Sequence, residues 1–154
     1  MEKIISALQQ FVSLVEGKNI FWILSGSVSL ALQGVDVVPK EDIDILTDAE
    51  GAKALDELLA DFVVKKSDYS STDKYRSYFG IYKISDIQIE VMGDFQYMTK
   101  EGSRSKENQT HDLLYKEYHG MRLPMLTLEQ ELQEYENMWR TEKADKIRQF
   151  LQTN

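Results

Sequence analysis

The sequence that decides the fold runs from Leu24 to Ile45 and reads LSGSVSLALQGVDVVPKEDIDI. The apolar run 20–24, which ends at the first residue of this stretch, predicts a buried strand, because it is short and rich in branched and aromatic residues. A Gly-Ser turn follows, and the apolar stretch 28–32 predicts a short helix that ends near Gly34. After a loop at 35–41, the alternating residues 42–45 predict a second strand. The order is therefore strand, turn, helix, loop and strand.

The turn at Gly26 and Ser27 is the first candidate binding site. Glycine permits a tight turn and a close backbone approach, and the start of a helix presents free N–H groups that suit a phosphate. A simpler interpretation is that Ser25 or Ser27 only caps the helix. Taken alone, the turn favours this simpler interpretation, because Gly-Ser turns before helices are common.

Asp42 and Asp44 form the second candidate site. Alternate side chains of a strand share a face, so the two carboxylates point the same way while Ile43 and Ile45 point into the core. Two carboxylates at that spacing can hold hard cations such as Mg²⁺ through oxygen. The competing interpretation is a half-exposed strand with a solvated acidic face. Like charges on one strand face repel each other, so the pair calls for compensation.

Glu90 is the third candidate residue. It lies in the alternating segment Ile87-Gln88-Ile89-Glu90-Val91, which predicts a strand with its isoleucines inward. If this strand lies beside the one that carries Asp42 and Asp44, the three carboxylates converge. Such a cluster is costly without a cation.

The rest of the chain predicts helices and hairpins around these strands. Thr47 with Glu50, and Thr127 with Gln130, have capping-box spacing. The stretch 99–110 has no large apolar residue, which predicts a mobile loop or an insertion that orders on binding. We expect helices at 2–16, 47–61, 127–138 and 141–152, and strands at 62–66, 75–84, 86–92, 113–118 and 121–125. The expected fold is α+β: a mixed, mostly antiparallel sheet with helices on one face and a C-terminal helical pair.

The order of these features resembles the nucleotidyltransferase (polymerase β-like) superfamily. Its signature is an apolar residue, Gly, then Gly or Ser, a spacer, and Asp-x-Asp with apolar residues between. Here it reads Leu24, then Ser25, then Gly26 and Ser27, fourteen residues, and Asp42-Ile43-Asp44-Ile45. The segment from Trp22 to Asp48 is most similar to small nucleotidyltransferase-domain proteins, including the lincosamide and aminoglycoside nucleotidyltransferases. Their later Pro-x-Leu and basic helix correspond in part to Pro124-Met125-Leu126 and to 140–146.

The resemblance implies a mechanism. Asp42, Asp44 and Glu90 would bind Mg²⁺, two ions in all, which hold the triphosphate of an NTP. Gly26 and Ser27 would contact the phosphates, and Glu90 would accept the proton of an attacking hydroxyl. The nucleotide monophosphate would pass to that hydroxyl, with pyrophosphate leaving.

The C-terminal helix offers cations for the same phosphates. Arg140 and Lys143 lie three residues apart, so one helix face can present both. The competing interpretation is a solvated helix with Glu142 and Lys146 paired at i,i+4. We weigh the two evenly for Lys143. Trp22 and Trp139 are interpreted as core or partial-core residues.

Length and composition limit the remaining possibilities. The 154 residues suggest one domain over 1–154, and a net charge of −8 argues against non-specific DNA binding. No cysteine is present, and the two histidines, His111 and His119, make a His-rich zinc site a poor expectation. No apolar run is long enough for a membrane span and the N-terminus lacks a signal-peptide pattern, so we expect a cytoplasmic protein.

Three functional hypotheses remain open. The first is a Mg²⁺-dependent nucleotidyltransferase acting on a small molecule, a protein or tRNA, with the loop 99–110 as a candidate for acceptor contact. The second is a catalytically inactive binding or antitoxin-like regulatory module with the same fold, because 154 residues leave little room for an acceptor-binding domain. The third is a plain acidic α+β protein without an active site. The position of Glu90 relative to Asp42 and Asp44 separates the third hypothesis from the others.

Overall fold

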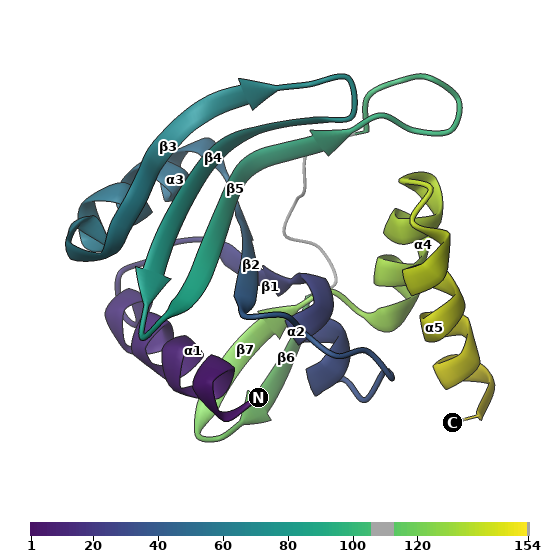
Figure 1. Cartoon of the computed structure of the whole chain (residues 1–154), viewed down its shortest axis with the longest axis horizontal. Helices are drawn as coiled ribbons and strands as arrows, with labels where there is room; N and C mark the ends of the chain where they lie inside the picture. The colour runs from purple at the N-terminus through teal and green to yellow at the C-terminus, as the bar shows by residue number, and fades with distance from the viewer. Residues whose placement is uncertain (106–112, 154) are drawn as a thin grey trace.

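Seven strands form one mixed sheet in the computed structural model, which describes residues 1–105 and 113–153. The strand order is β3-β4-β5-β2-β1-β7-β6 (Figure 1). β2 pairs with β5, and β1 with β7, in parallel; the other neighbours are antiparallel. The strands are β1 Trp22–Ser25, β2 Asp42–Thr47, β3 Val63–Ser71, β4 Tyr75–Ile84, β5 Ile87–Tyr97, β6 Leu114–Tyr118 and β7 Met121–Met125. The predicted α+β fold with a mostly antiparallel sheet is confirmed.

Five α-helices accompany the sheet in the described part of the chain. They are α1 Glu2–Val15, α2 Gly26–Leu32, α3 Ala49–Leu58, α4 Leu128–Asn137 and α5 Thr141–Thr153, with a 3₁₀ turn η1 at Ala60–Phe62. α1 and α3 share one apolar core with the strand residues Ile43, Ile45 and Ile89. α4 and α5 lie side by side on the other side of the molecule from α1 (Figure 1). In residues 1–105 and 113–153, no helix is long and apolar enough to cross a membrane.

A second apolar cluster fixes the α4–α5 pair. Leu30 of α2 packs with Tyr135 of α4 and with Ala144 and Ile147 of α5. Burial of such side chains is worth about 1.5–3 kcal/mol each for the larger aliphatic ones. The helical pair is therefore held against α2, which is the helix that begins at the Gly-Ser turn.

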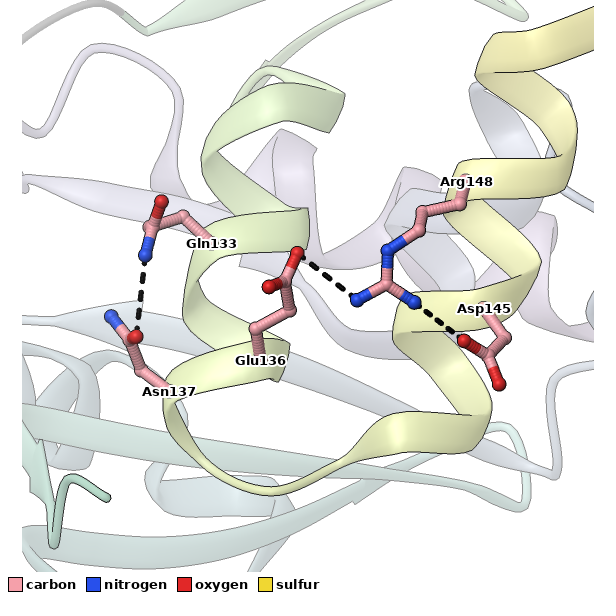
Figure 2. Close-up of polar contacts among 5 residues, drawn as sticks. All are labelled: Gln133, Glu136, Asn137, Asp145 and Arg148. Carbon is pink, nitrogen blue, oxygen red and sulfur yellow. Dashed lines mark hydrogen bonds and ion pairs between the residues drawn. The ribbon is translucent and has the colours of Figure 1, made fainter.

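Polar contacts join α4 and α5 on their exposed side. Figure 2 shows Arg148 of α5 between Glu136 of α4, at 3.2 Å, and Asp145 of its own helix. Gln133 also donates to Asn137 within α4 at 3.2 Å. Because these groups are largely exposed, each pair contributes at most about 1 kcal/mol.

The capping box expected at Thr47 and Glu50 is wrong. β2 continues through Thr47, which pairs with Trp22 and donates its hydroxyl to the carbonyl of Phe21. Asp48 is the N-cap of α3 instead, and it accepts from the N–H of Gly51 at 2.7 Å. By contrast, the capping box of Thr127 and Gln130 at the start of α4 is confirmed.

Two strands are longer than the sequence predicted. β3 reaches Ser71 and β5 reaches Tyr97, beyond the predicted ends at 66 and 92. Their outer parts pair with β4 although most residues of β3 are exposed. For β3 the apolar pattern could not show this, since the extension rests on backbone pairing rather than on burial. The extension of β5, by contrast, ends at the buried Tyr97. Of the predicted loop 99–110, only residues 99–105 belong to the described residues, and His111 also lies outside them.

Candidate active site

Three carboxylates converge at the centre of the sheet. β2 and β5 run parallel with Asp44 opposite Glu90, and Asp42 precedes Asp44 on the same face of β2. One oxygen of each of the three side chains lies within 4.8 Å of the others. The neighbours Ile43 and Ile45 are fully buried on the opposite face. The alternation of β2 and the pairing of β2 with β5 therefore build the cluster.

Crowding and burial change the titration of this cluster. Burial, and then the charge of Asp42, raise the pKa of Asp44. Burial, and then the charge of Asp44, raise the pKa of Glu90 to about 7. The carboxyl groups of Asp44 and Glu90 also share a hydrogen bond. Both shifts show that the site disfavours three negative charges at once, in the absence of a cation.

The chemistry of this donor set fits a hard divalent cation. Three half-buried carboxylates offer oxygen alone, which suits Mg²⁺ or Mn²⁺ rather than the softer transition metals. Asp42, Asp44 and Glu90 would hold the ion, and its charge would offset the repulsion among them.

Gly26 lies directly against this cluster. It is the first residue of α2 and has φ +67°. A Cβ at this position would clash with a carboxylate oxygen of Asp44 and would lie 3.1 Å from its Cγ. Two features therefore require glycine at this position: the left-handed backbone conformation and the close approach of Asp44. Ser25 is the N-cap of α2 but makes no side-chain capping bond, so its hydroxyl does not play the capping role that the sequence suggested.

Arg140 and Lys143 approach the carboxylates from the C-terminal helical pair. The guanidinium of Arg140 lies 6.0 Å, and the Nζ of Lys143 5.4 Å, from the ring centroid of Tyr135. Burial, and then the charge of Arg140, lower the pKa of Lys143, while the charge of Asp44 opposes this. Cation–π contacts with the Tyr135 ring thus help to hold both cations near the acidic cluster.

Lys146 does not form the ion pair with Glu142 that the solvated-helix interpretation expected. Its Nζ lies 3.6 Å from Asp36, which belongs to the loop between α2 and β2. This contact joins α5 to that loop across the site.

Two clefts meet at the carboxylates. The first, of about 860 Å³, lies between the loop 36–42, Ser27 and α5. We name the two clefts after the roles that we propose for them under Proposed function, and we call this one the donor-side cleft. The second, of about 380 Å³, lies over the outer parts of β3, β4 and β5, and we call it the acceptor-side cleft. Asp44, Arg140 and Lys143 line both.

All seven residues that the sequence singled out line these clefts. Ser27 and Asp42 line the donor-side cleft, and Gly26 and Glu90 line the acceptor-side cleft. His119 is a turn residue between β6 and β7 with φ +49° and does not line either cleft.

Sequence reasoning missed Trp139 and Glu131. The interpretation of Trp139 as a core residue is wrong: it is 63% exposed at the α4–α5 corner and lines the donor-side cleft. Glu131 is 2% exposed on α4, and no partner for its Oε1 is found among the described residues. Charge patterning on α4 carried no signal for its burial, because the neighbouring acidic residues Glu129 and Glu134 look alike in the sequence.

The sequence of the chain matches a known protein family. Residues 7–149 match the sequence profile of the aminoglycoside-2''-adenylyltransferases. No curated protein sequence matches the chain.

Solved structures agree with this match. TM1012 of Thermotoga maritima, described as a candidate nucleotidyltransferase, is 36% identical with a TM-score of 0.83, over 99% of this chain and 95% of the other. The lincosamide antibiotic adenylyltransferase LnuA, solved with lincomycin, has a TM-score of 0.55 at 18% identity, over 83% of each chain.

ANT(2'')-Ia in complex with adenylyl-2''-tobramycin has a TM-score of 0.55 at 11% identity, over 88% of this chain and 75% of the other. The last two likenesses concern the fold alone. The profile match and the similarity to TM1012 cover nearly the whole chain, and together with the Gly-Ser turn and the acidic cluster they lead to one conclusion. The chain belongs to the aminoglycoside-2''-adenylyltransferase family and is a nucleotidyltransferase.

Proposed function

We propose that this protein transfers a nucleoside monophosphate from an NTP to a hydroxyl group of an acceptor and releases pyrophosphate. The observation that carries the proposal is the cluster of Asp42, Asp44 and Glu90 at the junction of two clefts. One cleft can take the nucleotide and the other the acceptor, with the reacting atoms between them. ATP is the donor we favour, since the family and two of the similar structures carry adenylyl transfer in their names.

The donor-side cleft supplies groups for the triphosphate. Arg140 and Lys143 present positive charge beside Ser27 and the carboxylates. Charge-assisted hydrogen bonds of this kind are stronger than neutral ones. Gly26 and Ser27 would contact the phosphates where the chain turns closest to Asp44.

Asp42, Asp44 and Glu90 would hold Mg²⁺, with two ions as the expected number. When bound, Mg²⁺ would neutralise charge on the triphosphate and on the carboxylates. Of the three carboxylates, Glu90 alone lines the acceptor-side cleft without also lining the donor-side cleft, so we assign to it the role of receiving a proton from the acceptor hydroxyl.

In the proposed transfer, one bond to the α-phosphorus forms and one breaks. The acceptor oxygen bonds to the α-phosphorus and its proton passes to Glu90. The bond from the α-phosphorus to the bridging oxygen breaks, and pyrophosphate leaves with the electron pair. Positioning and charge neutralisation are the main sources of rate enhancement in such transfers.

The acceptor is a small molecule, a protein or tRNA; antibiotics are the first small molecules to test, because similar structures contain lincomycin and adenylyl-tobramycin. NTP is abundant in the cytoplasm, where we propose that the protein acts. The alternative, an inactive binding or antitoxin-like module, is disfavoured because every carboxylate and cation of the expected set is present.

Pyrophosphate release tests the proposal. Wild-type protein, Asp42→Asn and the control Asp86→Asn are incubated with Mg²⁺, ATP and either lincomycin or tobramycin. Asp86 lies in the exposed β4–β5 turn, away from both clefts. We expect release by wild type and by Asp86→Asn, and a loss of at least about a hundredfold in Asp42→Asn. Equal release by all three proteins would remove the acidic cluster from the reaction.

A further inference from the structure

The acceptor-side cleft has an unusual distribution of charge. Along the sheet away from Glu90, the lining residues of β4 are Phe79, Ser77 and Tyr75, which lie at alternate positions of the strand. Among the lining residues that the structure describes, the only carboxylates are Asp44 and Glu90 and the only cations are Arg140 and Lys143. The remaining surface of the cleft is therefore uncharged.

The charged groups of the cleft are already used in the proposed reaction. Asp44 and Glu90 belong to the cation-holding cluster, and Arg140 and Lys143 face the triphosphate. No lining carboxylate in the described chain is left to pair with an ammonium group of an acceptor. A desolvated ammonium without such a partner is strongly unfavourable.

The uncharged lining consists mainly of rings and hydroxyl groups, together with Gly26, Met92 and Met138. The rings of Tyr75 and Phe95 are stacked with centroids 5.7 Å apart, and Phe79 continues the ring-lined floor toward Glu90. Ser70, Thr72 and Ser77 add hydroxyl groups. Such a surface suits a molecule that has an apolar face to pack on rings and hydroxyl groups to hydrogen-bond. The volume of about 380 Å³ is that of a site for a drug-sized molecule.

We propose that the acceptor is a hydroxylated small molecule of low charge with an apolar face, and not a polycation such as an aminoglycoside. The inference rests on the proposed function and narrows its acceptor class. Arg140 and Lys143 are the only cations among the described lining residues, too few for the extended phosphate contacts of tRNA within this cleft, so a small molecule is the acceptor we favour.

A matched pair of variants tests the charge of the cleft. Ser70 lines the acceptor-side cleft, whereas Ser71, the next residue of β3, points to the other face and does not line it. Both are exposed, so an aspartate at either position leaves the fold intact. Ser70→Asp adds one carboxylate to the cleft, and Ser71→Asp adds the same charge outside it.

Binding is measured by calorimetry on the full chain. The protein is first saturated with Mg²⁺ and α,β-methylene-ATP, a donor analogue that is not transferred. Phenyl β-glucoside, uncharged with a ring and hydroxyl groups, lincomycin, with a single amine, and tobramycin, with several amines, are then titrated at pH 7.5. We expect tobramycin to bind at least tenfold more weakly than the better of the other two. Ser70→Asp should strengthen tobramycin binding about two- to fivefold, while Ser71→Asp leaves it unchanged.

Tighter binding of tobramycin than of both other probes by wild type would overturn the inference, as would a failure of both low-charge probes to bind. An equal effect of Ser70→Asp and Ser71→Asp on tobramycin binding would also overturn it, because tobramycin would then respond to the charge of the protein surface and not to a carboxylate that lines the cleft. Binding of Mg²⁺ and α,β-methylene-ATP, measured first, separates a failure of this inference from a failure of the proposed function. If the ATP analogue itself does not bind, the proposed function is wrong.

Discussion

Glu131 gives the sharpest prediction about stability. Its side chain is 2% exposed in α4, and burial, followed by the charge of Glu134, raises its pKa from 4.5 to about 8. The charge of Lys143 opposes this shift without cancelling it. The folded protein therefore keeps a proton on Glu131 that the unfolded chain releases above about pH 4.5.

The sign of the effect follows from the proton count. Between about pH 4.5 and pH 8 the folded state binds more protons than the unfolded state at this residue, so the free energy of unfolding decreases as pH rises. At about 1.4 kcal/mol per pKa unit, the difference between 4.5 and about 8 corresponds to roughly 5 kcal/mol. Glu131→Gln is a neutral replacement of the same shape that abolishes this dependence.

The assay is urea unfolding of wild type, Glu131→Gln and Glu129→Gln at pH 5.0 and pH 8.5. Glu129 is exposed on the same helix, so its replacement controls for loss of charge on α4. We expect the stability difference between Glu131→Gln and wild type to be larger at pH 8.5 than at pH 5.0 by about 4 kcal/mol, because this pH range covers most of the interval between the two pKa values. A gain that is the same at both pH values, or that Glu129→Gln reproduces, would refute the reasoning.

Three other predictions concern the turn, the cations and the helical pair. Gly17→Ala, at φ +74° with open space around it, should lower the free energy of unfolding by about 1–2 kcal/mol. Gly26→Ala should lower it by clearly more, because its Cβ also clashes with Asp44. Chemical denaturation measures both losses, and equal losses would contradict the close approach of Asp44 to Gly26. Lys143→Met should weaken binding of Mg²⁺-ATP by at least about tenfold in calorimetry, and unchanged affinity would exclude a phosphate contact. Arg148→Ala should cost less than about 1 kcal/mol in urea unfolding, since its side chain is 42% exposed; a larger loss would mean that the pairs in Figure 2 fix the α4–α5 pair.

The core of the site was predictable because it depends on local patterns. The alternation in Asp42-Ile43-Asp44-Ile45 settles which side chains face the core, and the same holds for the strand of Glu90. The sequence does not show whether the two strands are neighbours, since pairing between distant segments has no local signature. In the structure they are neighbours, with Asp44 opposite Glu90.

The sequence was less informative where tertiary contacts decide the outcome. Thr47 and Glu50 have capping-box spacing, but Thr47 is held in β2 by its pairing with Trp22, and Asp48 takes the capping position. Trp139 looks like a core residue by composition, yet the turn between α4 and α5 leaves it exposed with φ +63°. In the first case the pairing of two strands determines the role of the residue, and in the second the turn between two helices does so, rather than the residue type.

Metal-dependent nucleotide binding tests the central claim most directly. Calorimetric titration of wild type and of Asp42→Asn/Asp44→Asn with each of the four NTPs, with Mg²⁺ and with EDTA, measures whether the acidic cluster makes the nucleotide site. The account predicts binding of ATP by wild type that needs Mg²⁺ and that is lost in the double variant. ATP binding that persists in EDTA or in the double variant, or no binding of any NTP by wild type, would contradict it.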